Sequence, residues 1–364
     1  MRSLKLIIRI VALAVLVALV WSVLFVGLEC YSPGGQSPTP ADEVSRTISG
    51  LNGYARDQVS TFLTLPEWYI VYNTEEYGRH LGSQPPSRFP YLGSIRQYWR
   101  YYGAACGATR GVYPFSVPNH LMLAVIGSSF SFENALKGLY ENSIGRLTEW
   151  IAGHDTPEDV YAQAVAAEYG AFMHTVPWYD FPFRSRLVAL WTETPFWGRH
   201  LIRKWERRAA LSGEYGLKAI YGWLIGLGTH ASYGNEDLTI HAWIENAPDD
   251  VFADGTVKRK KDLGHHASIV TIPRYEAFTV RALLLLAQGV RFVDIAGNDH
   301  IVLTVLTPTS AASDDVGGEV IFREPLLTDP ETTRVAINVP VRSLHAVVEA
   351  LQRSGSKVEH LYDY

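Results

Sequence analysis

One apolar segment near the start of the chain limits the possible folds more than any other feature. From Ile10 to Leu28 the sequence contains no charged residue and consists mainly of Val, Leu, Ile, Ala and Phe. A helix needs about 20 apolar residues to cross the hydrocarbon core of a bilayer. This segment has that length, and no later segment does. We therefore expect residues 1–29 to form a transmembrane anchor.

The charges that flank this segment predict its orientation. Arg2, Lys5 and Arg9 precede it, and the first charged residue after it is Glu29. Because positive flanks stay in the cytoplasm, we expect a single-pass membrane protein with a cytoplasmic N-terminus. Most of the chain then lies on the non-cytoplasmic side, which is the periplasm in a bacterium. A cleaved signal peptide is the alternative, but its apolar region is usually only about 7–15 residues long.

The remainder of the chain has enough apolar residues to form globular cores. Of the 364 residues of the whole chain, 47% are hydrophobic and 12% are aromatic. Disordered chains are poor in both kinds of residue. Residues 30–44 include the sequence YSPGGQSPTP, which predicts a linker. Residues 45–236 show helix-length segments between Pro and Gly residues, and they predict a helical, aromatic-rich domain.

Residues 237–364 change to the alternating apolar pattern of strands. The expected strands are 238–244, 267–272, 290–295, 300–306, 319–322, 335–339 and 358–362, with helices at 275–288 and 343–353. The sequence Ala296-Gly297-Asn298-Asp299 predicts a hairpin between two of the strands. The predicted fold class is α+β, with a C-terminal ferredoxin-like sandwich of one antiparallel sheet and two helices. No internal repeat is visible in the sequence.

Net charge argues against a nucleic-acid partner. The chain carries 32 Lys and Arg residues and 37 Asp and Glu residues, and residues 237–364 contain 12 and 18 of them. Nucleic-acid-binding domains are usually basic, with Lys and Arg clustered on one face. We therefore expect no nucleic-acid partner.

The two cysteines, Cys30 and Cys106, are too few for a disulfide scaffold. A single bridge between them is allowed on the non-cytoplasmic side, where disulfides persist. A bridge also requires a specific geometry that the sequence does not reveal. The sequence therefore favours two unpaired thiols.

The strongest catalytic motifs are missing from the sequence. It contains no phosphate-binding Gly-rich loop before Lys-Ser/Thr, no H-E-x-x-H, no C-x-x-C and no G-x-S-x-G. His120, Glu168 and His174 are the candidate catalytic residues, because facing helices can present His and Glu to a metal or a substrate. Glu168 and His174 are six residues apart and point from different faces of a helix. A structural role is therefore the favoured interpretation, and the sequence identifies no metal or cofactor.

Residues 184–208 combine cations with tryptophans, which is typical of a helix on a membrane surface. The candidate membrane-surface residues are Arg184, Arg186, Trp191, Trp197, Arg203, Lys204, Trp205, Arg207 and Arg208. The alternative is an ordinary helix whose apolar stripe faces the core. The sequence slightly favours this alternative.

Aromatic residues are abundant in the helical region, particularly at 98–102 and 178–183. They predict either a core of large rings or an apolar cleft for a lipid-like ligand, and the core is narrowly favoured. The function that the sequence favours is a non-catalytic envelope protein that binds a membrane component or a partner protein. The alternative is a membrane-associated enzyme that acts on an apolar or lipid-like substrate.

Overall fold

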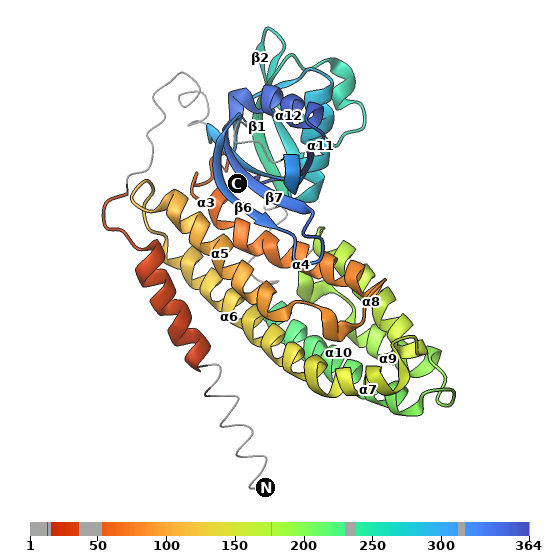
Figure 1. Ribbon diagram of the computed structural model, residues 1–364. Helices are drawn as coiled ribbons and strands as arrows, with labels where there is room; N and C mark the ends of the chain where they lie inside the picture. Colours follow the sequence, from red (N-terminus) through yellow and green to blue (C-terminus); the bar gives the residue numbers. More distant parts are fainter. Residues whose placement is uncertain are drawn as a thin grey trace. The chain divides into compact units, whose positions relative to one another are not determined.

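The computed structural model describes residues 13, 16–35, 53–175, 177–229, 238–311 and 317–363 (Figure 1). It divides into two compact units. Unit 1 comprises Met1–Glu67, Gln97–Gly127 and Gly234–Tyr364, and unit 2 comprises Trp68–Arg96 and Ser128–Tyr233. The predicted boundary at residue 236 differs from this division, because two segments from the helical region belong to the unit that contains the strands.

Helices account for most of the chain before the first strand. They are α3 (Ser60–Leu63), α4 (Leu65–Leu81), α5 (Tyr91–Thr109), α6 (Val117–Tyr140), α7 (Arg146–Ala152), α8 (Pro157–Met173), α9 (Phe183–Glu193) and α10 (Leu201–Thr229). The start of α8 follows from its sequence. Thr156 and Asp159 form a capping box, and Pro157 occupies the first turn.

The expected single helix over residues 184–208 is two helices. Helix α9 ends at Glu193, and α10 begins at Leu201. Pro195 explains the break, because proline disfavours helical backbone in the preceding residue and lacks the N–H that a continuing helix needs.

The C-terminal part of unit 1 is α+β with antiparallel strands, as predicted. Its elements are β1 (Thr239–Glu245), β2 (Lys258–Gly264), β3 (Ala267–Pro273), α11 (Glu276–Ala287), β4 (Arg291–Ile295), β5 (His300–Pro308), β6 (Glu319–Pro325), β7 (Thr332–Pro340), α12 (Leu344–Arg353) and β8 (Lys357–Leu361). They form two four-stranded sheets, ordered β2-β3-β1-β4 and β6-β7-β5-β8, instead of the single sheet that we expected. The predicted hairpin was wrong, because β4 pairs with β1 while β5 pairs with β7 and β8.

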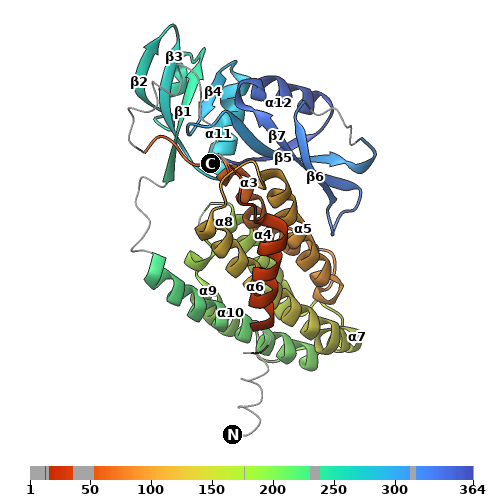
Figure 2. The ribbon, with the colours of Figure 1, turned by 90° about the vertical axis from the view of Figure 1, so that its left-hand side faces the viewer.

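The two sheets repeat one topology. Each contains three strands, a helix and a fourth strand, and all neighbouring strands are antiparallel. The first strand lies between the two strands that the helix connects, which is the split β-α-β arrangement of ferredoxin-like folds. Helix α11 contacts β3 and β8, and α12 contacts β4, β7 and β8. Figure 2 shows α11 and α12 among the strands of this part of the chain. The two copies therefore share one hydrophobic core, which extends from Ile240 to Leu361.

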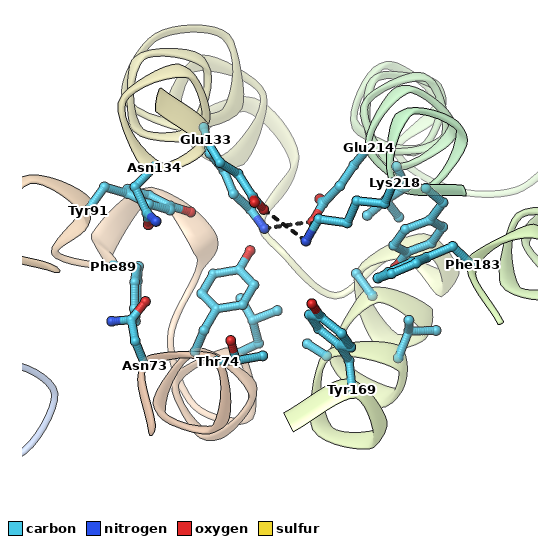
Figure 3. Close-up of a pocket in the computed structure, with 18 of the residues that line it drawn as sticks. Asn73, Thr74, Phe89, Tyr91, Glu133, Asn134, Tyr169, Phe183, Glu214 and Lys218 are labelled. Atoms are coloured by element: carbon cyan, nitrogen blue, oxygen red, sulfur yellow. Dashed lines mark hydrogen bonds and ion pairs between the residues drawn. The ribbon is translucent and has the colours of Figure 1, made fainter. Parts of the chain in front are cut away.

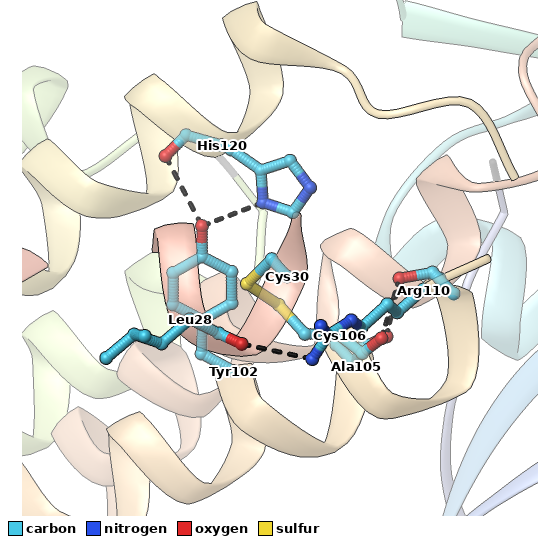
Figure 4. The surroundings of a disulfide bond; sticks show 8 residues. Leu28, Cys30, Tyr102, Ala105, Cys106, Arg110 and His120 are labelled. Atoms are coloured by element: carbon cyan, nitrogen blue, oxygen red, sulfur yellow. Dashed lines mark hydrogen bonds between the residues drawn. A yellow bond between two sulfur atoms is a disulfide. The ribbon is translucent and has the colours of Figure 1, made fainter. Parts of the chain in front are cut away.

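A disulfide fastens the N-terminal helix to α5 within unit 1 (Figure 4). It joins Cys30, at the end of the π-helical segment Val26–Cys30, to Cys106, so the prediction of two unpaired thiols was wrong. Beside it, Arg110 donates a hydrogen bond to the backbone oxygen of Leu28 at 3.0 Å. The ring of Phe25 lies 4.9 Å from that of Trp99. The disulfide, this hydrogen bond and this ring contact together hold the end of the N-terminal helix against α5.

The predicted anchor is only partly covered by the described residues. Residues 1–12, 14 and 15 lie outside them. Among the helices that are described, none combines the length and the apolar character that crossing a membrane requires.

Candidate functional site

Helix α10 in unit 2 buries four cations beside Leu211 and Tyr215 and exposes many of its other apolar residues. Arg203, Lys204, Arg207 and Arg208 are each at most 2% exposed. The exposed positions, among residues whose side chains are described, carry Leu201, Ile202, Trp205, Ala209, Gly213, Leu217, Ile220, Tyr221, Trp223 and Leu224. Most of these positions recur every three or four residues and form one stripe. A helix on the surface of a water-soluble domain shows the reverse arrangement, with charged residues outward.

The inward charges of α10 pair with acids from three neighbouring elements. Arg203 donates to Asp159 of α8 at 2.8 Å and to Glu206 at 3.1 Å. The other pairs are Lys204 with Glu158 at 2.7 Å, Arg208 with Glu158 at 2.6 Å, Arg207 with Glu141 at 2.7 Å and Arg203 with Glu149 of α7 at 3.4 Å. Burying an ion is costly unless a partner compensates it. These acids therefore allow α10 to turn its charges inward.

Four of the predicted membrane-surface cations are consequently misassigned. Arg203, Lys204, Arg207 and Arg208 are buried in ion pairs and cannot reach a lipid surface. The other five candidates are not buried in this way. Arg184, Trp191, Trp197 and Trp205 are exposed, and Arg186 is partly buried and paired with Glu168. The guanidinium of Arg208 lies 4.7–5.3 Å from the ring centres of Trp191, Phe196 and Trp205, which cover it.

A second outward apolar face belongs to the adjacent helices of unit 2. Its exposed residues are Leu136 and Leu139 of α6, Ile144, and Leu147, Trp150 and Ile151 of α7, with Trp150 83% exposed. An ion pair and a hydrogen bond join α6 to α10. Lys137 pairs with Glu214 at 2.9 Å, and the hydroxyl of Tyr140 donates a hydrogen bond to Glu206 at 2.6 Å. The two apolar faces therefore belong to neighbouring helices of one bundle.

A cavity of about 100 Å³ lies inside the same bundle, between α4, α6, α8 and α10 (Figure 3). Two lysines and two glutamates meet there. Lys218 lies 2.8 Å from Glu133 and 3.4 Å from Glu214, and Lys137 lies 2.9 Å from Glu214. Aromatic rings surround the amines, with Lys137 4.2 Å from the ring centre of Tyr77.

Glu214 and Lys218 in this cavity are charged at physiological pH. Burial raises the pKa of Glu214, but Lys137 and Lys218 outweigh it and lower that pKa to about 2. Burial lowers the pKa of Lys218, but Glu133 and Glu214 raise it well above its ordinary value. A general acid or base needs a pKa near the working pH. The geometry of this cluster therefore supports a structural or binding role rather than proton transfer.

The predicted catalytic residues each have separate partners. His120, in unit 1, lies 2.9 Å from the Tyr102 hydroxyl through its Nδ1 atom, and burial lowers the pKa of His120 to about 4. In unit 2, His174 lies 3.2 Å from Glu75, whereas Glu168 pairs with Arg186. Glu168 and His174 therefore form no common catalytic arrangement.

One group of three potential metal ligands occurs in the described part of the chain. The ligand atoms of Cys30, Cys106 and His120 lie within 4.8 Å of one another. Thiolates, not disulfide sulfurs, are metal ligands. The bond between Cys30 and Cys106 removes both thiolates, so this donor set does not fit a metal ion.

Lys137, Glu214 and Lys218 of the cavity were missed from the sequence, although a signal for them exists. Glu133 and Lys137 are four residues apart, as are Glu214 and Lys218, and each pair interrupts a largely apolar helix. Glu-to-Lys pairs at this spacing lie on one helix face.

The helical unit thus combines fixed internal charges with an apolar exterior, which suits binding to an apolar surface. Comparisons with known proteins add no relative on which a function could be based. No protein-family model matches the chain, and neither a curated protein nor a solved structure matches it.

Proposed function

We propose that this protein is a membrane-anchored, non-catalytic binding protein whose unit 2 lies with its outward apolar face in the membrane interface. The observation that carries the proposal is the reversed polarity of α10. Its charges are buried and paired, and its exposed stripe holds apolar residues such as Ile220, 60% exposed, and Trp223, 64% exposed. In membrane proteins, ionisable residues face the interior of a bundle and pair with one another, as they do here.

A lipid surface fits this face better than a protein partner does. Large exposed apolar patches mark either kind of contact. The apolar segment Ile10–Leu28, with its basic N-terminal flank, is expected to keep the chain at a membrane. Trp150, Trp197 and Trp223 are among the exposed residues of unit 2, and tryptophan is enriched where a membrane meets water.

An apolar photoreactive probe dissolved in the bilayer tests this proposal. The full chain is reconstituted into lipid vesicles and labelled, and the modified peptides are identified by mass spectrometry. We expect label in residues 10–28 and also in α6, α7 and α10. The paired substitution Ile220→Glu and Leu224→Glu should remove most of the label from α10. Val280→Glu, at an exposed position of α11 in unit 1, is the matched control. Label confined to residues 10–28 would contradict the proposal.

The enzyme alternative has less support from the geometry. A hollow of about 510 Å³ beside Arg184 and Glu193 in unit 2 is largely open to solvent. Ligand pockets usually measure about 300–1,000 Å³ and enclose most of the ligand, whereas the cavity between the helices measures about 100 Å³. Its lysines and glutamates are mutually paired. A membrane-binding role uses the exposed residues of the unit and needs no larger pocket.

A further inference from the structure

The strand pairings of the two C-terminal sheets can be matched, apart from one register shift at Asp262/Gly264 that only the first sheet has. In each copy, the first and fourth strands shift register once, at Trp243/Ile244 and at Thr304/Val305. The second and third strands also shift at equivalent places, at Arg259/Lys261 and at Val320/Phe322. Shared bulges are specific features of a sheet, so the two registers can be aligned without ambiguity.

This alignment places the edge strand β2 on the edge strand β6. Ile240 pairs with Ile272 as Ile301 pairs with Val339, so Thr271 matches Asn338. Through their partners in β3 and β7, Lys258 then matches Glu319, Arg259 matches Val320, Lys261 matches Phe322 and Asp262 matches Arg323. At three of these four positions β2 is basic where β6 is acidic or apolar, and at the fourth Asp262 stands where β6 has Arg323.

In the second copy, helix α5 contacts the C-terminal part of β6 and the central strand β7 within unit 1. The ring of Tyr101 lies 4.1 Å from that of Phe322, and its hydroxyl accepts a hydrogen bond from Arg334 at 3.3 Å. Arg100 forms an ion pair with Glu324 at 2.9 Å. Gln97 donates to the backbone oxygen of Pro325 at 2.8 Å. A basic helix thus lies against an acidic and apolar edge.

In the first copy, the equivalent strand has few side-chain contacts in the described part of the chain, chiefly those of Arg259 with Phe252 and Asp249. Six of the seven residues of β2 are exposed, and Lys258, Lys260 and Lys261 have no acidic partner among the described residues. Arg259, on the opposite face, pairs with Asp249. Lysines on an edge strand also oppose the addition of another strand, so a helix is the better-fitting occupant.

We propose that β2 is a docking site for a helix of a partner protein, and that the contacting face of this helix is acidic. The internal copy suggests the mode of binding, because α5 contacts Phe322, the residue that matches Lys261. Because Lys258, Lys260 and Lys261 make the edge of β2 basic, we expect the contacting face of the partner helix to be acidic. This proposal concerns unit 1 and does not depend on the membrane contact of unit 2.

A charge-inverted version of α5 provides the probe. The peptide has the sequence of residues 91–109 with Arg96→Glu, Gln97→Glu, Arg100→Glu and Cys106→Ser, and a side-chain lactam holds it helical. Its binding to the full chain in neutral-lipid nanodiscs is measured by fluorescence anisotropy. Exposed ion pairs contribute little individually, so Lys258→Glu, Lys260→Glu and Lys261→Glu together should raise Kd about tenfold.

Two controls keep the experiment decisive. Arg342→Glu, Arg353→Glu and Lys357→Glu change three exposed cations elsewhere in unit 1 and should leave Kd unchanged. A peptide with the native α5 charges should bind the wild-type chain more weakly and the β2 variant more strongly. Unchanged thermal unfolding of the β2 variant shows that it is folded.

Three outcomes would overturn the proposal. Equal affinity of the acidic peptide for wild type and the β2 variant would place the contact elsewhere. Binding of anionic vesicles through β2 without binding of the peptide would assign the lysines to lipid headgroups. Absence of peptide binding that is restored by deleting residues 36–52 would show that the chain itself occupies the edge.

Discussion

Helices α10 and α12 have clear apolar periodicity, but they use it in opposite directions. In α12 of unit 1, Leu344, Val347, Val348 and Leu351 are buried in the shared core, and Glu349 is exposed. In α10 of unit 2, the apolar stripe is exposed and the charges are buried. Periodicity defines two faces of a helix but does not decide which one is inside. The difference supports the proposal that unit 2 contacts less polar surroundings than unit 1 does.

The largest expected effect comes from removing one acid below α10. Glu158 faces both Lys204 and Arg208, and all three are buried. Glu158→Gln should lower the free energy of unfolding by about 3–5 kcal/mol, because an unpaired buried charge is costly. Urea unfolding of the full chain in detergent measures this change. Glu168→Gln is the control, with an expected cost of about 0–1 kcal/mol for an exposed pair. Similar effects of the two substitutions would break the contrast between α10 and α12.

The two units should respond to pH in opposite directions. In unit 1, burial raises the pKa of Glu67 to about 7 and of Asp363 to about 7, although Arg274 partly opposes it. Folded unit 1 therefore binds more protons than the unfolded chain, and its stability should fall as pH rises from about 4 to about 7. Each carboxyl should contribute on the order of 3 kcal/mol to this change. In unit 2, the lowered pKa of Glu214 gives stability that is lost only as pH falls from about 4 to about 2.

Hydrogen exchange followed by mass spectrometry can separate these responses. Peptides of the β-strands should exchange faster at pH 8 than at pH 5, after correction for intrinsic rates, whereas peptides of α10 should not. Glu67→Gln with Asp363→Asn should flatten the dependence in unit 1, and Glu349→Gln on exposed α12 should leave it intact. A persistent slope in the double variant would assign the pH response to other groups.

The disulfide should stabilise unit 1 by a smaller amount. Cys30 and Cys106 are 76 residues apart, so their bond restricts a long segment of the unfolded chain. Cys30→Ala with Cys106→Ala should lower the free energy of unfolding by about 2–4 kcal/mol. Reduction of the wild-type chain should have the same effect, and the reductant should not affect the double variant. If reduction leaves the wild type unchanged, then the ring and hydrogen-bond contacts of the N-terminal helix suffice to hold it.

Local features of the sequence predicted local structure well. Thr156 and Pro157 gave the start of α8, and the alternation at residues 238–244 gave β1. The duplication escaped notice because it preserves topology and register rather than residue types: Lys261 stands where Phe322 does. The ion-pair network escaped because Glu141, Glu158 and Asp159 lie far along the chain from α10. A cation-rich segment looks the same in sequence whether its partners are acids of its own fold or lipid headgroups.

The smallest expected effect concerns the outer face of α10. Ile220 is exposed, so Ile220→Gln should change the free energy of unfolding in detergent by no more than about 0.5 kcal/mol, as at other surface positions. Val348, at the matching apolar stripe of α12, is buried, and Val348→Gln should cost about 2–4 kcal/mol because it removes core packing and buries an amide. Urea unfolding of both variants under one set of conditions gives the comparison. If Ile220→Gln is as destabilising as Val348→Gln, then the outer stripe of α10 is packed against protein, and the polarity of unit 2 is not reversed.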